Sequence, residues 1–355
     1  MIRVIDGVVS MIVEPEIITS SVRNVDFLRD VGEVEIEENG RDTENGDVVV
    51  VEVIGEGGYY DRAEVEGGEM VGLEVGQLLV GVLGERKAVQ GFSSEIPERL
   101  EKGDELDFVS SGGVMAKCVS SPEGIGEPYN LKFLGFVTKD GKRVNISDYS
   151  LEMSEKLEVD CPLVLVASSR MDAGKTTLCC GLVKRFFETG KNVGALKLTG
   201  VTRQRDTLLM KKSGALKAYE FTDCGLPSST GDSDKAVMAS KGLINEVGRE
   251  ADVVVAELGA GLLSSYNVLE VLKDSEIKKA CVSLVFMSLD PVGAYGGIRI
   301  LEDHSYTPDV ISGPSTDTEA GRENIRRFTD VPVLNGMKSM DEIFEIVRKK
   351  VFPGE

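Results

Sequence analysis

The sequence has little of what several familiar catalytic and structural classes require. Its single histidine, His304, stands in a polar context just past a helical stretch, so a Ser-His-Asp triad is not supported. Its six cysteines have no paired spacing, and two of them, Cys179 and Cys180, are adjacent. A disulfide framework is therefore not implied, and we expect reduced thiols in a cytoplasmic protein.

Long apolar runs and an excess of positive charge are also missing. The opening stretch "MIRVIDGVVSMIVEPEI" is interrupted by Asp6 and Glu14, so we expect a strand there, not a signal peptide or a membrane span. Sixty acidic residues against 40 basic ones give a formal net charge of -20. Nucleic acids and anionic membranes are polyanionic, so neither is expected as a general partner.

What is present suits a two-domain globular protein of 355 residues with 41% hydrophobic residues. Residues 1–146 contain short Val-rich segments broken by glycine, such as "GDVVVVEVIGEGG", which predict a smaller β-rich domain, a barrel or a sandwich. Residues 147–160 are polar and read as a linker. Residues 161–355 form the second predicted domain.

In the second domain, apolar runs of strand length alternate with helical stretches. The predicted strands are residues 162–168, 192–198, 217–222, 251–258, 280–289, 308–313 and 331–336. Continuous apolar runs are typical of parallel strands covered on both faces, so we predict an α/β domain with a doubly wound parallel sheet. Ligands of such sheets bind at the loops after the carboxyl ends of the strands.

The first of these loops carries "SSRMDAGKTT", between a strand and a helix, which is the context of a phosphate-binding P-loop. Lys175 would neutralise the β and γ phosphates, and the Thr176 hydroxyl would bind Mg²⁺. The predicted cofactor-binding residues are Ser169, Arg170, Met171, Asp172, Ala173, Gly174, Lys175, Thr176 and Thr177. Ser169 replaces the first glycine of the full pattern, which the loop tolerates if that residue has negative φ. The alternative is a chance Gly-Lys-Thr at a helix start.

Three charged residues on later segments complete the predicted centre. Glu257 ends an apolar strand and would orient Mg²⁺ or its water, as acids do at this place in P-loop proteins. Lys197 ends another strand and would hold an anionic substrate, and Asp206 in the next loop or first helical turn would be a metal ligand with Thr176 and Glu257. The alternatives are a solvated strand end for the two strand residues and a helix cap for Asp206.

The segment "EFTDCGLPSSTGDSD" supplies candidate substrate residues, Asp223, Ser228 and Ser229, on a glycine-bearing loop. Any surface loop has a similar composition, so this segment is only a supporting signal. The loops after residues 280–289 and 308–313 follow later strands, and we expect one of them to contact a base or the substrate.

The order of "DAGKTT", "GALKLTG", "EFTDCGLPSS", "AELGAGLL" and "SLDPVGAYGGIRIL" resembles domain-of-unknown-function family 1611, whose members include D-glutamate N-acetyltransferases. The N-terminal segments resemble the β-rich domain of the same proteins. More distantly, the chain is similar to dethiobiotin synthetase and the cobyrinate a,c-diamide synthases. Those enzymes activate a substrate with ATP, which implies a P-loop NTPase-like fold and catalytic roles for Lys175, Lys197 and Glu257. This chain reads "ELGAG" where those enzymes have "EGAG".

These features predict a Mg²⁺-dependent enzyme that uses ATP to phosphorylate or ligate a small anionic metabolite. An alternative is a coenzyme A-dependent N-acyltransferase acting on a D-amino acid, with acetyl-CoA held by the P-loop. A third is a nucleotide-dependent switch or an accessory protein of cofactor biosynthesis. GTP stays open beside ATP, because an accessory protein of molybdopterin guanine dinucleotide synthesis has a similar P-loop. A homo-oligomer is also left open.

Overall fold

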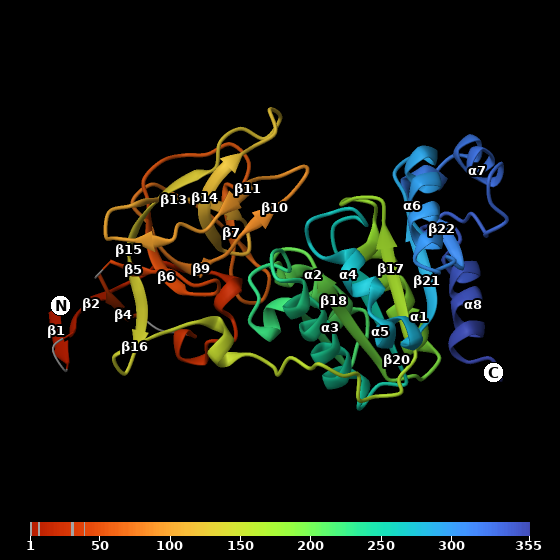
Figure 1. Ribbon diagram of the computed structural model, residues 1–355, viewed down its shortest axis with the longest axis horizontal. Coiled ribbons are helices and arrows are strands. Elements are labelled where there is room, and N and C mark those ends of the chain that lie inside the picture. Colours follow the sequence, from red (N-terminus) through yellow and green to blue (C-terminus); the bar gives the residue numbers. More distant parts are fainter. Residues whose placement is uncertain (1, 6–7, 30–31, 39) are drawn as a thin grey trace. The chain divides into compact units, whose positions relative to one another are not determined.

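The computed structural model describes residues 2–5, 8–29, 32–38 and 40–355. They form two compact units, drawn in Figure 1. The β unit contains residues 1–151, 201–205 and 221–231, and the α/β unit contains residues 152–200, 206–220 and 232–355. Two short segments from the C-terminal half of the chain thus belong to the β unit. The predicted boundaries at 146 and 161 divide the chain in sequence order and so do not include this arrangement.

Strands dominate the β unit, and most of them are short. Its strands are β1 (Ile2–Ile5), β2 (Val8–Val13), β3 (Ile17–Ile18), β4 (Val34–Glu37), β5 (Arg41–Asp42), β6 (Val48–Val53), β7 (Arg62–Glu64), β8 (Met70–Gly72), β9 (Leu78–Leu83), β10 (Arg86–Lys87), β11 (Ser93–Glu95), β12 (Arg99–Leu100), β13 (Glu105–Ser110), β14 (Val114–Ser120), β15 (Tyr129–Lys139) and β16 (Lys142–Arg143). Four 3-10 turns lie among them: η1 (Ser20–Val22), η2 (Asp26–Leu28), η3 (Ile146–Tyr149) and η4 (Phe221–Cys224).

Five of these strands close into a small barrel. The hydrogen-bonded circuit runs β6, β9, β14, β13 and β15 and returns to β6, with only the β9–β14 pair parallel. Alternation along β6 places Val49 and Val51 in one core cluster, with Phe108 and Phe133, and Val50 in the cluster on the other face. The Val-rich segments therefore bury both faces, one inside the barrel and one beneath the surrounding turns.

The segments 201–205 and 221–231 are bound to the rest of the β unit by specific contacts. The Glu64 carboxylate is fully buried and accepts hydrogen bonds from the backbone amides of Gln204 (2.7 Å) and Arg205 (2.9 Å). A carboxylate at this place satisfies two of the amides that have no partner within a helix's first turn. Glu64 thus caps the helix that begins at Gln204, although the two residues are far apart in sequence.

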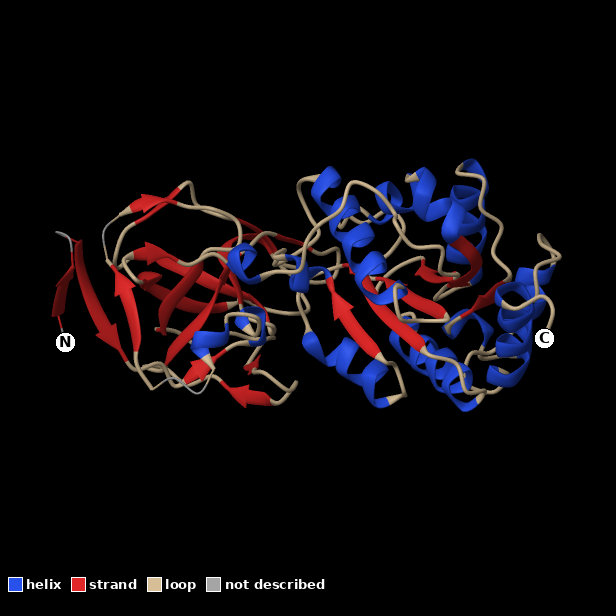
Figure 2. Cartoon of the chain, turned by 90° about the horizontal axis from the view of Figure 1, so that it is seen from below, coloured by secondary structure: helices blue, strands red, loops and turns tan. Residues whose placement is uncertain are grey.

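The α/β unit contains a six-stranded sheet flanked by helices, as Figure 2 shows. Its strands are β17 (Leu163–Ser168), β18 (Val193–Thr199), β19 (Lys217–Glu220), β20 (Val253–Leu258), β21 (Cys281–Met287) and β22 (Val310–Ser312). The helices after the linker are α1 (Lys175–Glu188), α2 (Gln204–Lys212), α3 (Ser233–Gly248), α4 (Val268–Lys273), α5 (Ser275–Ala280), α6 (Pro291–Asp303), α7 (Glu319–Arg326) and α8 (Met340–Val351), with the 3-10 turn η5 (Pro314–Thr316). The first two residues of α2 lie in the segment that belongs to the β unit.

The sheet is parallel throughout, in the order β19-β18-β20-β17-β21-β22. On one face Val164 and Val166 of β17 pack in a core cluster with Leu182 and Phe186 of α1 and Val347 of α8. Helix α3 packs against β18, β19 and β20, and α5 and α6 pack against β21. This doubly wound parallel sheet confirms the predicted fold class.

One of the predicted strands does not form. The run 331–336 is not a strand, because Val333 makes only a single parallel bridge to Ile311 before the chain turns toward α8. The opening stretch forms β1 and β2, and Asp6 between them lies outside the described residues. Residues 152–160 run along α3, where the Ser154 amide donates to the Met238 carbonyl oxygen at 3.0 Å.

Candidate functional site

The loop after β17 has the backbone conformation of an anion-binding nest. Asp172 has φ of 60° and Gly174 has φ of 88°, so two left-handed residues, separated by Ala173, which is not among the described residues with positive φ, lie immediately before α1. Successive amides in such a conformation point into one concavity. Within the described residues, no backbone amide from Arg170 to Thr177 donates a hydrogen bond to the protein. Together with the positive end of the α1 dipole, this arrangement favours a phosphate group.

Ser169 fits the loop without strain at its own backbone. Ser169 is not one of the described non-glycine residues whose φ is positive, and its amide donates to the Met287 carbonyl oxygen at 2.9 Å. A Cβ at Gly261 would lie 2.4 Å from the Ser169 carbonyl oxygen, so a glycine there makes the close approach of the two segments feasible. The Ser169 Oγ is buried without a hydrogen-bond partner in the protein. An unpaired hydroxyl at this position is suited to contact a bound phosphate.

Lys175 opens α1 and is only 5% exposed. Its Nζ donates to the Ser168 Oγ and to the Ala260 carbonyl oxygen, both at 2.8 Å. Burial lowers the pKa of Lys175, and the negative charge of Glu257 opposes that shift. Both acceptors are neutral, so an anionic phosphate is the stronger electrostatic partner for this ammonium group.

Thr176 and Glu257 form the pair on which the metal prediction depends. The Thr176 Oγ1 donates to the Glu257 Oε2 at 2.8 Å, and Glu257 stands on β20, directly beside Val166 of β17. Burial raises the pKa of Glu257, while Lys175 and Lys197 oppose the shift. A hydroxyl and a carboxylate are the protein oxygens by which P-loop proteins hold Mg²⁺, so these residues fit that ion. Across the described ranges, no group of three or more His, Cys, Asp or Glu side chains is placed to hold a metal by itself.

Lys197 is the centre of a buried ion-pair cluster. Its Nζ lies 2.7 Å from the Asp206 Oδ2 and 3.6 Å from the Glu220 Oε2. Burial would lower the pKa of Lys197, but the charges of Asp206, Glu220 and Glu257 outweigh it and the pKa is raised. Asp206 lies in the first turn of α2, as expected. Glu220 has no signal in the sequence pattern, because its position depends on the pairing of β18 with β19.

The three candidate substrate residues after β19 lie in the β unit. The Asp223 Oδ1 accepts hydrogen bonds from the Arg23 Nη2 at 2.8 Å and from the Asn24 Nδ2 at 3.1 Å. The hydroxyl groups of Ser228 and Thr230 are 2.8 Å apart, and Ser229 is 1% exposed. Each of these side chains has a contact or a degree of burial that suits a structural role.

A pocket of about 250 Å³ adjoins the phosphate-binding loop. The wall on one side consists of Asp172, Ala173, Gly174, Thr177 and Leu178. The other lining residues are Met287, then Gly313, Pro314 and Asp317 from the loop after β22, and Asn335, Gly336 and Met337. We expected one of the loops after the later strands to contact a base or the substrate. Met287 at the end of β21 and the loop after β22 both line this pocket of the α/β unit.

Two polar side chains in this pocket are hydrogen-bonded to each other. The Asn335 Nδ2 donates to the Asp317 Oδ1 at 2.8 Å, and the Asn335 Oδ1 accepts from the amides of Met337 and Lys338. Asn335 is 5% exposed, whereas Asp317 is exposed. Asn335 was not predicted, because 331–336 resembled a strand. Asp317 lies in the loop after 308–313, which we expected to contact a base or the substrate, but nothing in the sequence singled it out within that loop.

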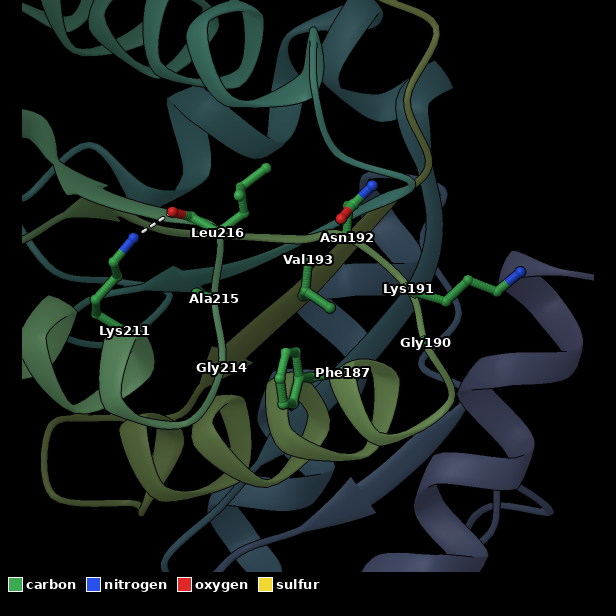
Figure 3. A pocket seen from close by; sticks show the side chains of 9 residues that line it. All are labelled: Phe187, Gly190, Lys191, Asn192, Val193, Lys211, Gly214, Ala215 and Leu216. Atoms are coloured by element: carbon green, nitrogen blue, oxygen red, sulfur yellow. Dashed lines mark hydrogen bonds between the residues drawn. The ribbon is translucent and has the colours of Figure 1, made fainter.

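A second hollow, of about 420 Å³, lies between the C-terminal ends of α1 and α2 (Figure 3). Phe187 and Val193 line it, and the Lys211 Nζ donates to the Leu216 carbonyl oxygen at its margin. Val193 begins β18, so this hollow is at the amino edge of the parallel sheet. The P-loop follows the carboxyl end of β17, and the hollow is therefore separate from the phosphate site.

No described helix combines the length and the hydrophobicity that crossing a membrane requires. No protein-family model matches the sequence, and no curated protein matches it either.

Several solved structures are similar to part of the chain. They include the hydrogenase maturation factor HypB from Archaeoglobus fulgidus (15% identity, 54% of this chain, 91% of that one, TM-score 0.39). A DUF1611 family protein from Anabaena variabilis has 16% identity over 59% of this chain and 66% of its own, with a TM-score of 0.40. The signal recognition particle receptor FtsY from Elizabethkingia anophelis has 14% identity over 58% and 76%, with a TM-score of 0.37.

A DUF1611 family protein, the family to which the order of motifs in this chain is similar, is thus among these structures. Identities and TM-scores this low bear on neither activity nor substrate. The parallel sheet order and the loop between β17 and α1 are what identify the α/β unit as a P-loop fold.

Proposed function

We propose that the chain is a Mg²⁺-dependent P-loop enzyme that binds a nucleoside triphosphate and transfers or cleaves its terminal phosphoryl group. The observation that carries this proposal is the run of unbonded amides from Arg170 to Thr177, beside the buried ammonium of Lys175 and the Thr176–Glu257 pair. Amides and ammonium match the charge of a polyphosphate. The hydroxyl and carboxylate match a divalent cation.

In this proposal each residue acts through position and charge. The loop amides hold the phosphate oxygens, and Lys175 exchanges its two neutral acceptors for an anionic one as charge develops on the transferred group. Thr176 and Glu257 would hold Mg²⁺, which supplies positive charge to the phosphates when bound. No covalent nucleophile is required, which agrees with the absence of a catalytic triad in the sequence.

The acceptor in this proposal is a small anionic metabolite, phosphorylated or ligated at a carboxylate. Lys197 and Asp206 would stand on its side of the centre, and Lys197 would pair with the metabolite only once one of the two carboxylates that now hold it has moved away. Asp206 is then available to the metal only if it leaves Lys197. Asp223 contributes less to this proposal than the sequence suggests, because its carboxylate already pairs with Arg23.

The proposal favours phosphoryl transfer over N-acyl transfer because of the Thr176–Glu257 pair. A thioester donor requires no metal for its chemistry, whereas phosphoryl transfer draws on one. The test is to incubate the full chain with ATP or GTP, Mg²⁺ and a panel of small carboxylic acids, and to follow phosphate and diphosphate release. We expect release that depends on Mg²⁺, stops with excess EDTA and is lost in Lys175→Ala. Consumption of acetyl-CoA without any nucleotide turnover would establish the acyltransferase alternative instead.

A further inference from the structure

We propose that the pocket between the P-loop and the loops 313–317 and 335–337 takes the base of the nucleotide, and that Asp317 selects guanine over adenine. This inference rests on the proposed function, because it assigns the remainder of a nucleotide whose phosphates lie on the loop amides. The pocket shares Asp172, Ala173 and Gly174 with the phosphate-binding loop. A ligand held by its phosphates at α1 therefore has a continuous path into it.

The size and the walls of the pocket suit a flat ring system. Its volume of about 250 Å³ is below the ~300–1,000 Å³ of sites for whole drug-sized ligands. Apolar atoms come from Leu178, Met287, Pro314 and Met337. The Met337 side chain is 76% exposed, and a flexible thioether can cover the face or edge of an aromatic ring.

The hydrogen-bonding groups in the pocket are those that complement guanine. An ionised carboxylate only accepts hydrogen bonds, and guanine presents two neighbouring donors, N1–H and the 2-amino group, on one edge. Among the described residues, the Asp317 carboxylate accepts a side-chain hydrogen bond only from Asn335, so Oδ2 and a second lone pair on Oδ1 are left for a ligand. Adenine lacks this pair of donors, since its N1 is an acceptor and would face the carboxylate unfavourably.

The side-chain amide of Asn335, which could otherwise recognise adenine, already has hydrogen-bond partners in the protein. An Asn side chain pairs with adenine by offering both its oxygen and its amide nitrogen. In this pocket the Asn335 oxygen already accepts two backbone amides, and one N–H donates to Asp317. Only one N–H of Asn335 is left, which is a donor suited to the O6 acceptor of guanine.

The test is isothermal titration of the full chain, with Mg²⁺, against GDP, ADP, xanthosine diphosphate and inorganic pyrophosphate. We expect GDP to bind about tenfold or more tightly than ADP, the size of effect that hydrogen bonds to a charged group give. Asp317→Asn should remove that preference and bind xanthosine diphosphate more tightly than GDP. The reason is that xanthine has an oxygen where guanine has the 2-amino group, and Asn offers the N–H that this oxygen accepts.

Asp317→Asn keeps an oxygen for Asn335, so the variant should retain the wild-type melting temperature. Asp330→Asn, at an exposed aspartate outside the pocket lining, should leave all four affinities unchanged. Equal binding of GDP, ADP and pyrophosphate by the wild type would overturn the base assignment while leaving the phosphate site intact. A preference for ADP, or a GDP preference that survives Asp317→Asn, would overturn it too. No binding of any of the four would reject the proposed function itself.

Discussion

Gly174 shows at the scale of one residue how the phosphate-binding loop depends on backbone conformation. Its φ of 88° is in the left-handed region, where a Cβ is strained. We expect Gly174→Ala to lower the free energy of unfolding by about 1–2 kcal/mol, measured by urea denaturation. Gly296, inside α6, has no heavy atom within 4 Å of its would-be Cβ, and Gly296→Ala should instead stabilise by about 0.5–1 kcal/mol. If both variants changed the free energy of unfolding in the same direction, the φ angle would not be what determines the cost of adding a Cβ.

The residues of the centre were predictable where they are close in sequence or follow a known order of motifs. Lys175, Thr176 and Glu257 were identified in this way, and the structure brings the last two within 2.8 Å of each other. The space that Ser169 needs was not predictable, because it depends on Gly261, which only the fold brings near. Glu220, the second carboxylate near Lys197, was not predictable either, because its position depends on the pairing of β18 with β19.

At the scale of elements, strands could be predicted where continuous apolar runs are buried on both faces, as in β17, β20 and β21. The order of those strands could not, because periodicity contains no information on which runs pair. Residues 331–336 were predicted wrongly for a related reason. Val333 and its neighbours are apolar but turn beside β22 after one bridge, and so place Asn335 in the pocket.

Cysteines at the ends of these elements give a prediction on pH. Burial raises the pKa of Cys161 to about 11 and those of Cys224 and Cys281 to about 12, from a usual value of 9.0, with nearby aspartates adding to the shifts. The fold therefore favours the protonated thiols. Their contribution to stability is complete below pH 9.0 and is lost as the pH rises through these folded-state values.

Thiolate absorbance during an alkaline titration measures this shift directly. We expect the folded chain to ionise these thiols only above the range in which the same chain ionises them in urea, and its melting temperature to fall over that interval. Coincident titration curves for the folded and the denatured chain would contradict the assigned burial.

For the whole molecule, the β unit is assembled from segments far apart in sequence. Arg23 and Asp223 form a buried ion pair whose side chains are 6% and 8% exposed. Removing one partner leaves a buried charge uncompensated, so Asp223→Ala should lower the free energy of unfolding by about 3–5 kcal/mol. Glu270→Ala breaks the half-exposed pair with Lys273 and should cost at most about 1 kcal/mol. An Asp223→Ala variant of normal stability but reduced turnover would restore Asp223 as a substrate residue.

The sequence predicted two compact parts, of which one is rich in strands and the other has a parallel sheet. It could not predict that 201–205 and 221–231 join the first part, because these loops follow β18 and β19 in chain order. Their membership depends on contacts such as the Glu64 cap on Gln204 and Arg205, between positions with no shared local pattern.

The central claim is that the loop from Ser169 to Thr177 binds nucleotide phosphates through its amides and Lys175. The most direct measurement is the affinity of the full chain for GDP, ADP and coenzyme A, compared between Lys175→Ala and Lys184→Ala. Lys184 lies on the same helix, with an exposed side chain paired to Glu188, and provides the matched control. We predict that Lys175→Ala loses affinity about 10- to 100-fold, and that Lys184→Ala binds as the wild type does. Unchanged affinity of Lys175→Ala for all three ligands would contradict the account.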